Sequence, residues 1–217
     1  MKEFTTSLLD FLFPPSCPLC GGGPEGGEAG VCPRCWEEIK GAFRGELSET
    51  AWGGALFVLA GFEGKVQEAI HLMKYRHRPS IGRVFGRYLG EALSEYPRFR
   101  DLDIVVPVPL HWKRRRGRGY NQSEGIALEV GKVLGVPVER ALRRTRNTPS
   151  QTGLDAQERE ENVRDAFRAR RAFEGEKMLL VDDVLTTGAT ASECVRALLE
   201  AGTGEVVVAV VARPALS

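Results

Sequence analysis

The segment from Met178 to Thr190 constrains the fold more than any other part of the chain. Its residues, MLLVDDVLTTGAT, predict a buried strand that ends in two adjacent carboxylates, Asp182 and Asp183. A short loop of threonines and one glycine follows, and an amphipathic helix is predicted over 189–201. In doubly wound α/β folds, ligands bind at the carboxyl ends of the parallel strands. The segment therefore predicts such a fold, with a binding site at the end of this strand.

The rest of the chain repeats the alternation of strands and helices. Short runs rich in valine, leucine and isoleucine predict strands at 56–60, 104–106, 177–181 and 205–211. Apolar residues recur at the helical period over 66–73, 81–93 and 121–134. Asn121 and Glu124 are expected to cap the last of these helices. Such runs are typical of a sheet covered on both faces, so the predicted class is a doubly wound, mostly parallel α/β fold.

The loop after the two carboxylates has the chemistry of an anion site. Its backbone N–H groups and hydroxyls lie at a helix N-terminus, and Gly188 allows the backbone to approach a phosphate closely. The residues expected to bind this phosphate are Thr186, Thr187, Gly188, Ala189 and Thr190. Asp182 and Asp183, expected to face solvent at the strand end, can accept hydrogen bonds from vicinal hydroxyls. A diol together with a phosphate indicates a ribose 5-phosphate. The purely structural alternative is an Asp-Asp turn whose threonines cap the helix.

Four of the five cysteines form two C-x-x-C pairs near the N-terminus. The pairs are Cys17 with Cys20 and Cys32 with Cys35, and the spacer between them is rich in glycine. Two such knuckles can bring four thiolates into the tetrahedron that Zn²⁺ prefers. Four protein ligands leave no open coordination position for a substrate, so the pattern indicates a structural rather than a catalytic zinc site. The alternative is two disulfides or spare thiols. Cys194, on a predicted helix, is expected to be a small buried core residue.

Length and hydropathy divide the chain into two parts. Its 217 residues suit one core domain and a small appendage. We expect residues 1–50 to contain an N-terminal helix, the zinc module and most of a linker over 41–53, and residues 51–217 to form the core domain. No apolar run approaches the ~20 residues that cross a bilayer, and Asp10 interrupts the apolar N-terminus, which makes a poor signal peptide. We therefore expect a cytoplasmic protein without a membrane span.

The charges are unevenly distributed along the chain. The formal net charge is +1, but residues 51–150 contain 18 basic and 9 acidic side chains, while each flank is net acidic. Such a basic block indicates a polyanionic partner, either phosphates or nucleic acid. The candidate residues for this contact are Arg114, Arg115, Arg116, Arg118, Arg144 and Arg146. The alternative for each arginine is an ordinary solvated surface position.

The segment 178–190 resembles the 13-residue signature of type I phosphoribosyltransferases at all thirteen positions. The resemblance extends to the ComF family of competence-associated proteins. It is carried by the paired C-x-x-C module, by Leu72-Met73-Lys74-Tyr75-Arg76, by Pro107-Val108-Pro109 and by Arg118-Gly119-Tyr120-Asn121-Gln122. It implies a type I phosphoribosyltransferase-like domain behind a zinc module, with a role in DNA uptake and natural transformation.

The resemblance also implies a substrate and roles for individual residues. The donor would be 5-phosphoribosyl 1-pyrophosphate, bound with Mg²⁺, and Asp182 and Asp183 would be the catalytic residues that hold its ribose. The loop after the first strand, with Arg114 to Arg118, would bind pyrophosphate, and a flexible loop over about 144–163 would close over the substrate.

Three functions remain open from the sequence. The first is a phosphoribosyltransferase with an unknown acceptor. The second is a protein that handles single-stranded DNA together with the competence machinery, with Tyr75, Trp112 and Tyr120 as stacking platforms. The third is a regulator that senses the donor without turnover. The sequence does not distinguish among them, because a fold alone does not determine function, and it leaves the oligomeric state open.

Overall fold

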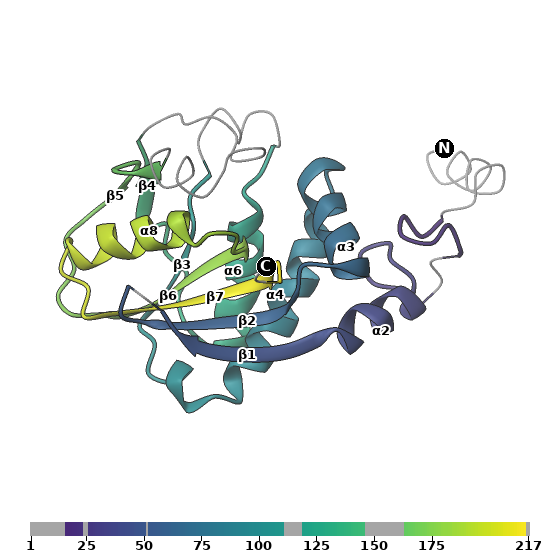
Figure 1. Cartoon of the computed structure of the whole chain (residues 1–217), viewed down its shortest axis with the longest axis horizontal. Helices are drawn as coiled ribbons and strands as arrows, with labels where there is room; N and C mark the ends of the chain where they lie inside the picture. The colour runs from purple at the N-terminus through teal and green to yellow at the C-terminus, as the bar shows by residue number, and fades with distance from the viewer. Residues whose placement is uncertain (1–15, 24–25, 51, 111–118, 146–162, 216–217) are drawn as a thin grey trace, which may run out of the picture.

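The computed structural model describes residues 16–23, 26–50, 52–110, 119–145 and 163–215. Its centre is a five-stranded sheet of order β1-β2-β7-β6-β3 (Figure 1). The strands are β1 (Phe43–Glu49), β2 (Ala55–Gly61), β3 (Ile104–Pro107), β6 (Lys177–Val184) and β7 (Glu205–Arg213). All neighbours pair in parallel except β1, which runs antiparallel to β2 at the edge.

Helices cover both faces of this sheet. One apolar cluster joins it to α3 (Gly64–Tyr75), α4 (Pro79–Ser94) and α6 (Gln122–Leu134). The other cluster joins it to α8 (Ala189–Leu199) and to a two-stranded ribbon of β4 (Leu142–Arg144) and β5 (Phe167–Ala169). The predicted doubly wound, mostly parallel class is confirmed, and each strand and helix predicted for the core domain forms within a few residues of its expected bounds.

The apolar runs of the strands follow from this two-sided cover. In β2, Phe57 and Leu59 pack toward α3 and α4, whereas Leu56 and Val58 pack toward α8. Successive side chains of a strand point to opposite faces, so both sets must be apolar when both faces are buried.

The prediction of a linker over 41–53 is wrong. Helix α2 (Pro33–Gly41) extends to residue 41, and residues 43–49 form strand β1 on the edge of the main sheet. Most side chains of β1 are exposed, so its sequence FRGELSE carries no apolar run that would mark a strand. The division into residues 1–50 and 51–217 stays a prediction, because β1 belongs to the first part and completes the sheet of the second.

Arg144, at the start of the predicted flexible loop, is the last residue of β4; residues 146–162 lie outside the described part of the chain, so the loop stays a prediction. One local prediction at the start of α6 is also wrong. Asn121 precedes α6 but makes no side-chain cap, because its amide donates to the carbonyl of Val108 at 3.0 Å. Glu124 instead accepts a hydrogen bond from Arg140. The hydrogen bond from Asn121 to the Val108 carbonyl therefore links the start of α6 to the end of β3.

Helices α4 and α6 pack so closely that Gly86 has no room for a side chain. A Cβ there would lie 2.5 Å from the carbonyl oxygen of Ile126. We expect Gly86→Ala to lower the free energy of unfolding by about 1–3 kcal/mol, because a packed backbone must move. Gly125→Ala is the matched control: it faces open space in α6, so alanine should be neutral or stabilising. Urea unfolding measures both, and equal stabilities would contradict the close packing.

Within the described residues, no helix is both long enough and apolar enough to cross a bilayer.

Candidate functional site

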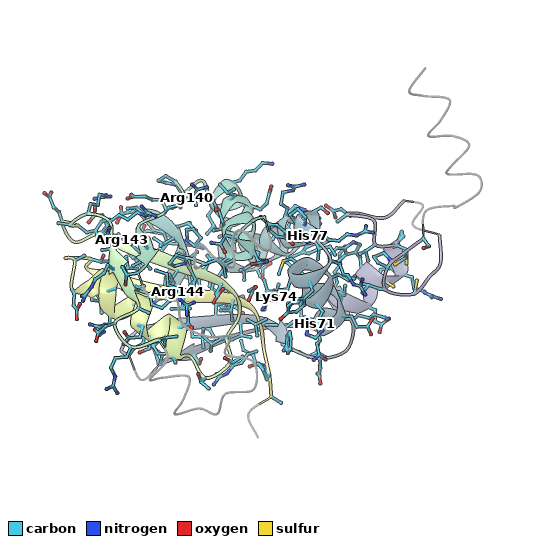
Figure 2. All side chains as sticks on the ribbon, turned by 90° about the horizontal axis from the view of Figure 1, so that it is seen from above. His71, Lys74, His77, Arg140, Arg143 and Arg144 are labelled. Atoms are coloured by element: carbon cyan, nitrogen blue, oxygen red, sulfur yellow. The ribbon has the colours of Figure 1, made fainter. Side chains whose placement is uncertain are left out.

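A pocket of about 380 Å³ opens at the carboxyl ends of β3 and β6. Its lining comes mainly from the β6–α8 loop, the start of α6 and α3. Strand β4 contributes Arg144 (Figure 2). The predicted site residues that line the pocket are Arg144, Asp182, Asp183, Thr186, Gly188 and Thr190.

Asp182 is half-buried and held by two hydrogen bonds. The Ser123 hydroxyl donates to its Oδ1 at 2.6 Å, and the backbone N–H of Asp183 donates to the same oxygen at 2.8 Å. Burial, and after it the charge of Asp183, raise the pKa of Asp182 to about 7, although Ser123, Lys74 and the Asp183 N–H act in the opposite direction. Asp182 therefore changes charge near neutral pH.

The prediction that Asp183 faces solvent is wrong. Asp183 is buried, and the Lys74 ammonium lies 2.8 Å from its Oδ1. The expectation is wrong because α3 packs beside the strand end and covers it, which no local pattern around residue 183 indicates.

The loop between β6 and α8 has the backbone of an anion site. Gly188 has a φ of +84°, which glycine adopts at little cost, and it directly precedes α8. The Ala189 N–H points to the Thr187 hydroxyl at 3.4 Å. A Cβ at Gly188 would lie 3.1 Å from the Trp52 ring, so the loop is held from behind. Among the described residues, Thr187 and Ala189 do not line the pocket.

Part of the pocket lining is a row of three rings, from Phe62, His71 and Tyr75. The centroid of the His71 ring lies 5.8 Å from that of Phe62 and 5.8 Å from that of Tyr75. Tyr75 remains 59% exposed. From sequence, Tyr75 is predicted only as a stacking platform, and Lys74 is not predicted as a site residue at all. The one sequence signal for Lys74 is the run Leu72–Arg76 that carries the family resemblance. Ser123 had no signal at all.

The predicted arginines are only partly within the described chain. Arg144 lies 5.2 Å from the centroid of the Phe167 ring and borders the pocket. The other five candidates lie outside the described residues, as does Trp112. They are Arg114, Arg115, Arg116, Arg118 and Arg146. Tyr120 donates its hydroxyl to the backbone carbonyl of Met73, which fastens it to α3.

A second site is formed by the four cysteines of the N-terminal module. Their sulfur atoms all lie within 4.8 Å of one another. The Sγ–Sγ distances are 3.9 Å from Cys17 to Cys35 and 3.6 Å from Cys20 to Cys32. Four thiolates at about 2.3 Å from Zn²⁺ would place their sulfurs about 3.8 Å apart, so the cluster fits the ion. The four are free thiols, not disulfides. The arrangement supports a structural zinc ion.

The surroundings of the four thiols act on them differently: the pKa of Cys20 is lowered, mainly by a backbone hydrogen bond from Gly22, whereas burial and the neighbouring cysteines raise that of Cys35. Burial raises the pKa of Cys17, but hydrogen bonds from the backbone of Cys32, Leu19 and Cys20 outweigh it and lower the pKa to about 6. The thiolate is the form that binds metal. The fifth cysteine, Cys194, is fully buried in the core as predicted, and burial raises its pKa.

The module is packed onto the main core. The Trp36 ring meets Phe85 of α4 edge-on at 5.7 Å, and its indole N–H donates to the carbonyl of Glu28 at 2.8 Å. The Lys65 ammonium of α3 donates to the carbonyl of Leu19, between the first two cysteines, at 3.0 Å. The cysteine loop, α3 and α4 thus share one apolar cluster.

Comparison with known proteins finds two family models that match separate parts of the chain. A model of the double zinc ribbon domain matches residues 8–46, and a model of the phosphoribosyl transferase domain matches residues 121–215. A solved structure, the glutamine phosphoribosylpyrophosphate amidotransferase from B. subtilis complexed with ADP and GMP, is 26% identical, with a TM-score of 0.45. That match covers 65% of this chain and 30% of the other.

Two relatives match along most of the chain. Competence protein F of Haemophilus influenzae is 28% identical over 214 residues, which cover 88% of this chain and 93% of that protein. DNA utilization protein YhgH of Escherichia coli is 33% identical over 155 residues, which cover 70% of this chain and 68% of that protein. With a zinc ribbon ahead of a phosphoribosyltransferase-type domain, this chain belongs to the ComF family of competence protein F and YhgH.

Proposed function

We propose that the chain binds 5-phosphoribosyl 1-pyrophosphate with Mg²⁺ in the pocket at the end of β6 and transfers its phosphoribosyl group to an acceptor. One observation carries this proposal: two adjacent carboxylates and a glycine-containing loop at a helix N-terminus border the same pocket. A diol and a phosphate one sugar ring apart are the groups that such a pair would bind together.

The hydrogen bonds within the site support this role for the carboxylates. All three contacts to them, from Ser123, from the Asp183 N–H and from Lys74, end on an Oδ1 atom. Among the described residues, each Oδ2 is therefore left for a ligand. We assign the two Oδ2 atoms to the ribose hydroxyls, and the loop from Thr186 to Thr190 to the 5-phosphate.

The site is suited to a Mg²⁺ ion that arrives with its ligand. Both carboxylates are already engaged by protein groups, so they offer no preformed cage. Mg²⁺ characteristically keeps several waters and binds substrate phosphates rather than an all-protein cage, so the ion would arrive with the donor and Asp182 and Asp183 would lie beside it. When bound, the ion would neutralise charge on the leaving pyrophosphate.

The reaction breaks the bond between the anomeric carbon and the pyrophosphate oxygen, which leaves with the electron pair. The anomeric carbon gains positive charge before the acceptor's lone pair forms the new bond. Asp182 and Asp183 would favour this cationic state, and Arg144 would stabilise the departing anion. A site closed to water would protect the donor from hydrolysis.

Calorimetric titration of the wild type with donor and Mg²⁺ tests binding. A pyrophosphate-release assay over free bases and single-stranded DNA then tests transfer and identifies the acceptor. Binding without release would favour a sensor of the donor, and no binding would contradict the proposal.

A second candidate function is the handling of single-stranded DNA. It is favoured by the basic block over 51–150 and by the names of the relatives, which refer to competence and to DNA utilization. Tyr75, exposed beside the pocket, is suited to stack on a base. Donor binding and DNA binding are compatible, because the acceptor is unassigned.

Reversing Arg114, Arg115 and Arg116 to glutamate should weaken single-stranded DNA binding for all sequences alike. Each phosphate contact contributes about 0.7 to the slope of log affinity against log salt, so losing three should reduce that slope by about 2. Fluorescence anisotropy over a salt series measures both quantities. Arg168→Glu, an exposed reversal outside the block, is the control. If the triple variant binds single-stranded DNA as tightly as the wild type, these arginines are ordinary solvated surface residues.

A further inference from the structure

Lys74 is placed in the pocket by a part of the chain that neither family model covers. It lies in the last turn of α3, between the segments matched at 8–46 and 121–215. Its ammonium lies 2.8 Å from Asp183 Oδ1, with the two side chains 18% and 10% exposed. Among the described residues, this is the one ion pair that either carboxylate of the Asp182–Asp183 pair makes.

The carboxylate pair needs such a cation. Two adjacent acidic groups in a partly buried site repel each other, and burial adds to the cost of charging them. Burial and the charge of Asp183 already raise the pKa of Asp182 to about 7, while Lys74 acts in the opposite direction. Without the ammonium, the pair would retain a proton to higher pH. A carboxylate accepts stronger hydrogen bonds from hydroxyls than a protonated acid does.

Helix α3 is fastened at both ends, so it delivers this ammonium from a fixed position. Lys65 in its first turn holds the cysteine loop through the carbonyl of Leu19. In its last turn the carbonyl of Met73 accepts the Tyr120 hydroxyl, and Ile70 is fully buried on the same helix. A charged group held by a rigid, packed element needs little reorganisation when a ligand binds.

We infer that Lys74 is a positioning residue of the donor site: its ammonium holds the Asp183 carboxylate in place through their ion pair and lowers the cost of ionising Asp182, so that both can bind the ribose hydroxyls. The inference rests on the proposed function for the identity of the ligand. It also gives the zinc module a role at the pocket, because the same helix joins Lys65 at the cysteine loop to Lys74.

Other groups around the pocket must be separated from Lys74 in any test. His71 and Tyr75 of α3 and Arg144 of β4 line the same pocket. Figure 2 labels His71 and Lys74 on α3 and Arg144 on β4. His71→Gln therefore accompanies the variants below, since histidine is the side chain that most often changes charge near neutral pH.

The first readout needs no donor. Carbon-13 NMR of the side-chain carboxyls follows the titration of the Asp182–Asp183 pair in wild type, Lys74→Met and Lys74→Arg. We expect Lys74→Met to raise the apparent pKa of the pair by about one unit or more, and Lys74→Arg to keep it near the wild-type value. His71→Gln should leave it nearly unchanged. Lys74→Met alone leaves Asp183 as an unpaired buried anion and could fail to fold. In that case, the titration of Asp182 is compared between Asp183→Asn and the double variant Lys74→Met/Asp183→Asn, which both lack that anion.

The second readout is donor binding against pH. Lys74→Met should bind at least about tenfold more weakly than wild type near pH 7, and recover part of the loss as the pH rises and the pair deprotonates. Lys74→Arg should remain within about threefold, since its charge is retained. Identical carboxyl titrations in wild type and Lys74→Met would overturn the inference, as would parallel pH profiles of binding. If the wild type binds no donor, the proposed function fails, while the carboxyl titration still decides the role of Lys74.

Discussion

Replacing Asp182 and Asp183 together by asparagine should reduce the affinity for 5-phosphoribosyl 1-pyrophosphate by roughly a hundredfold or more. Each hydrogen bond to a charged group contributes about 1.5–3 kcal/mol, and the variant weakens two of them. Asparagine is preferred to alanine because Asp183 is buried against Lys74, where truncation would also leave a cavity. Calorimetric titration with donor and Mg²⁺ measures the loss.

Two controls separate ligand contacts from damage to the fold. Thr187→Val should have a smaller effect, because the backbone donors of the loop remain and Thr187 does not line the pocket. The triple variant with Lys74→Met removes the ammonium that the double variant leaves unpaired, and it should not restore binding. Equal affinities of the double variant and wild type would mean that the carboxylates do not hold the ribose.

Removing one zinc ligand, as in Cys32→Ser, should release the metal and unfold the N-terminal module. Metal binding supplies about 10–16 kcal/mol of apparent free energy in small zinc-finger peptides. The free energy lost with the metal is therefore larger than the free energy of unfolding of a module of this size. From sequence, the damage is expected mainly within residues 15–40. The structure extends it to α3 and α4, because Trp36 packs on Phe85 and Lys65 holds the carbonyl of Leu19.

Elemental analysis and hydrogen exchange together test this expectation. Protein purified without added metal should contain about one zinc per chain, as four closed thiolate ligands require, and Cys32→Ser should contain almost none. Exchange should accelerate in the module first, then in α3 and α4, and least in β6 and β7. Cys194→Ser is the matched control, since this buried cysteine lies in the other apolar cluster and should leave the zinc content unchanged. Retained zinc in Cys32→Ser would contradict the assignment.

The strands and helices of the main sheet could be predicted because their signals are local. Strands β2, β6 and β7 are buried on both faces, so the apolar run itself identifies them. Strand β1 and the β4–β5 ribbon lacked such a signal. Strand β1 exposes most of its side chains, and β4 and β5 have three residues each, so only pairing with distant segments makes them strands.

In the candidate site too, the residues that could be predicted are those with a local sequence signal. Asp182, Asp183 and the loop to Thr190 are consecutive, so one segment of sequence predicts a strand end, an anion loop and a helix start together. The spacing of the four cysteines likewise predicts a metal site from sequence, and the structure brings their sulfur atoms within 4.8 Å of one another.

Only the tertiary structure decided what surrounds those groups. Ser123 reaches Asp182 from α6, and Lys74 reaches Asp183 from α3, because the packing of the two helices on one face of the sheet brings them to the end of β6. A hydroxyl and an ammonium on amphipathic helices have no local pattern that distinguishes them from surface residues. Sequence alone determined which groups could bind a phosphorylated sugar and a metal; the charge balance of the sugar site depends on long-range packing, which no local pattern encodes.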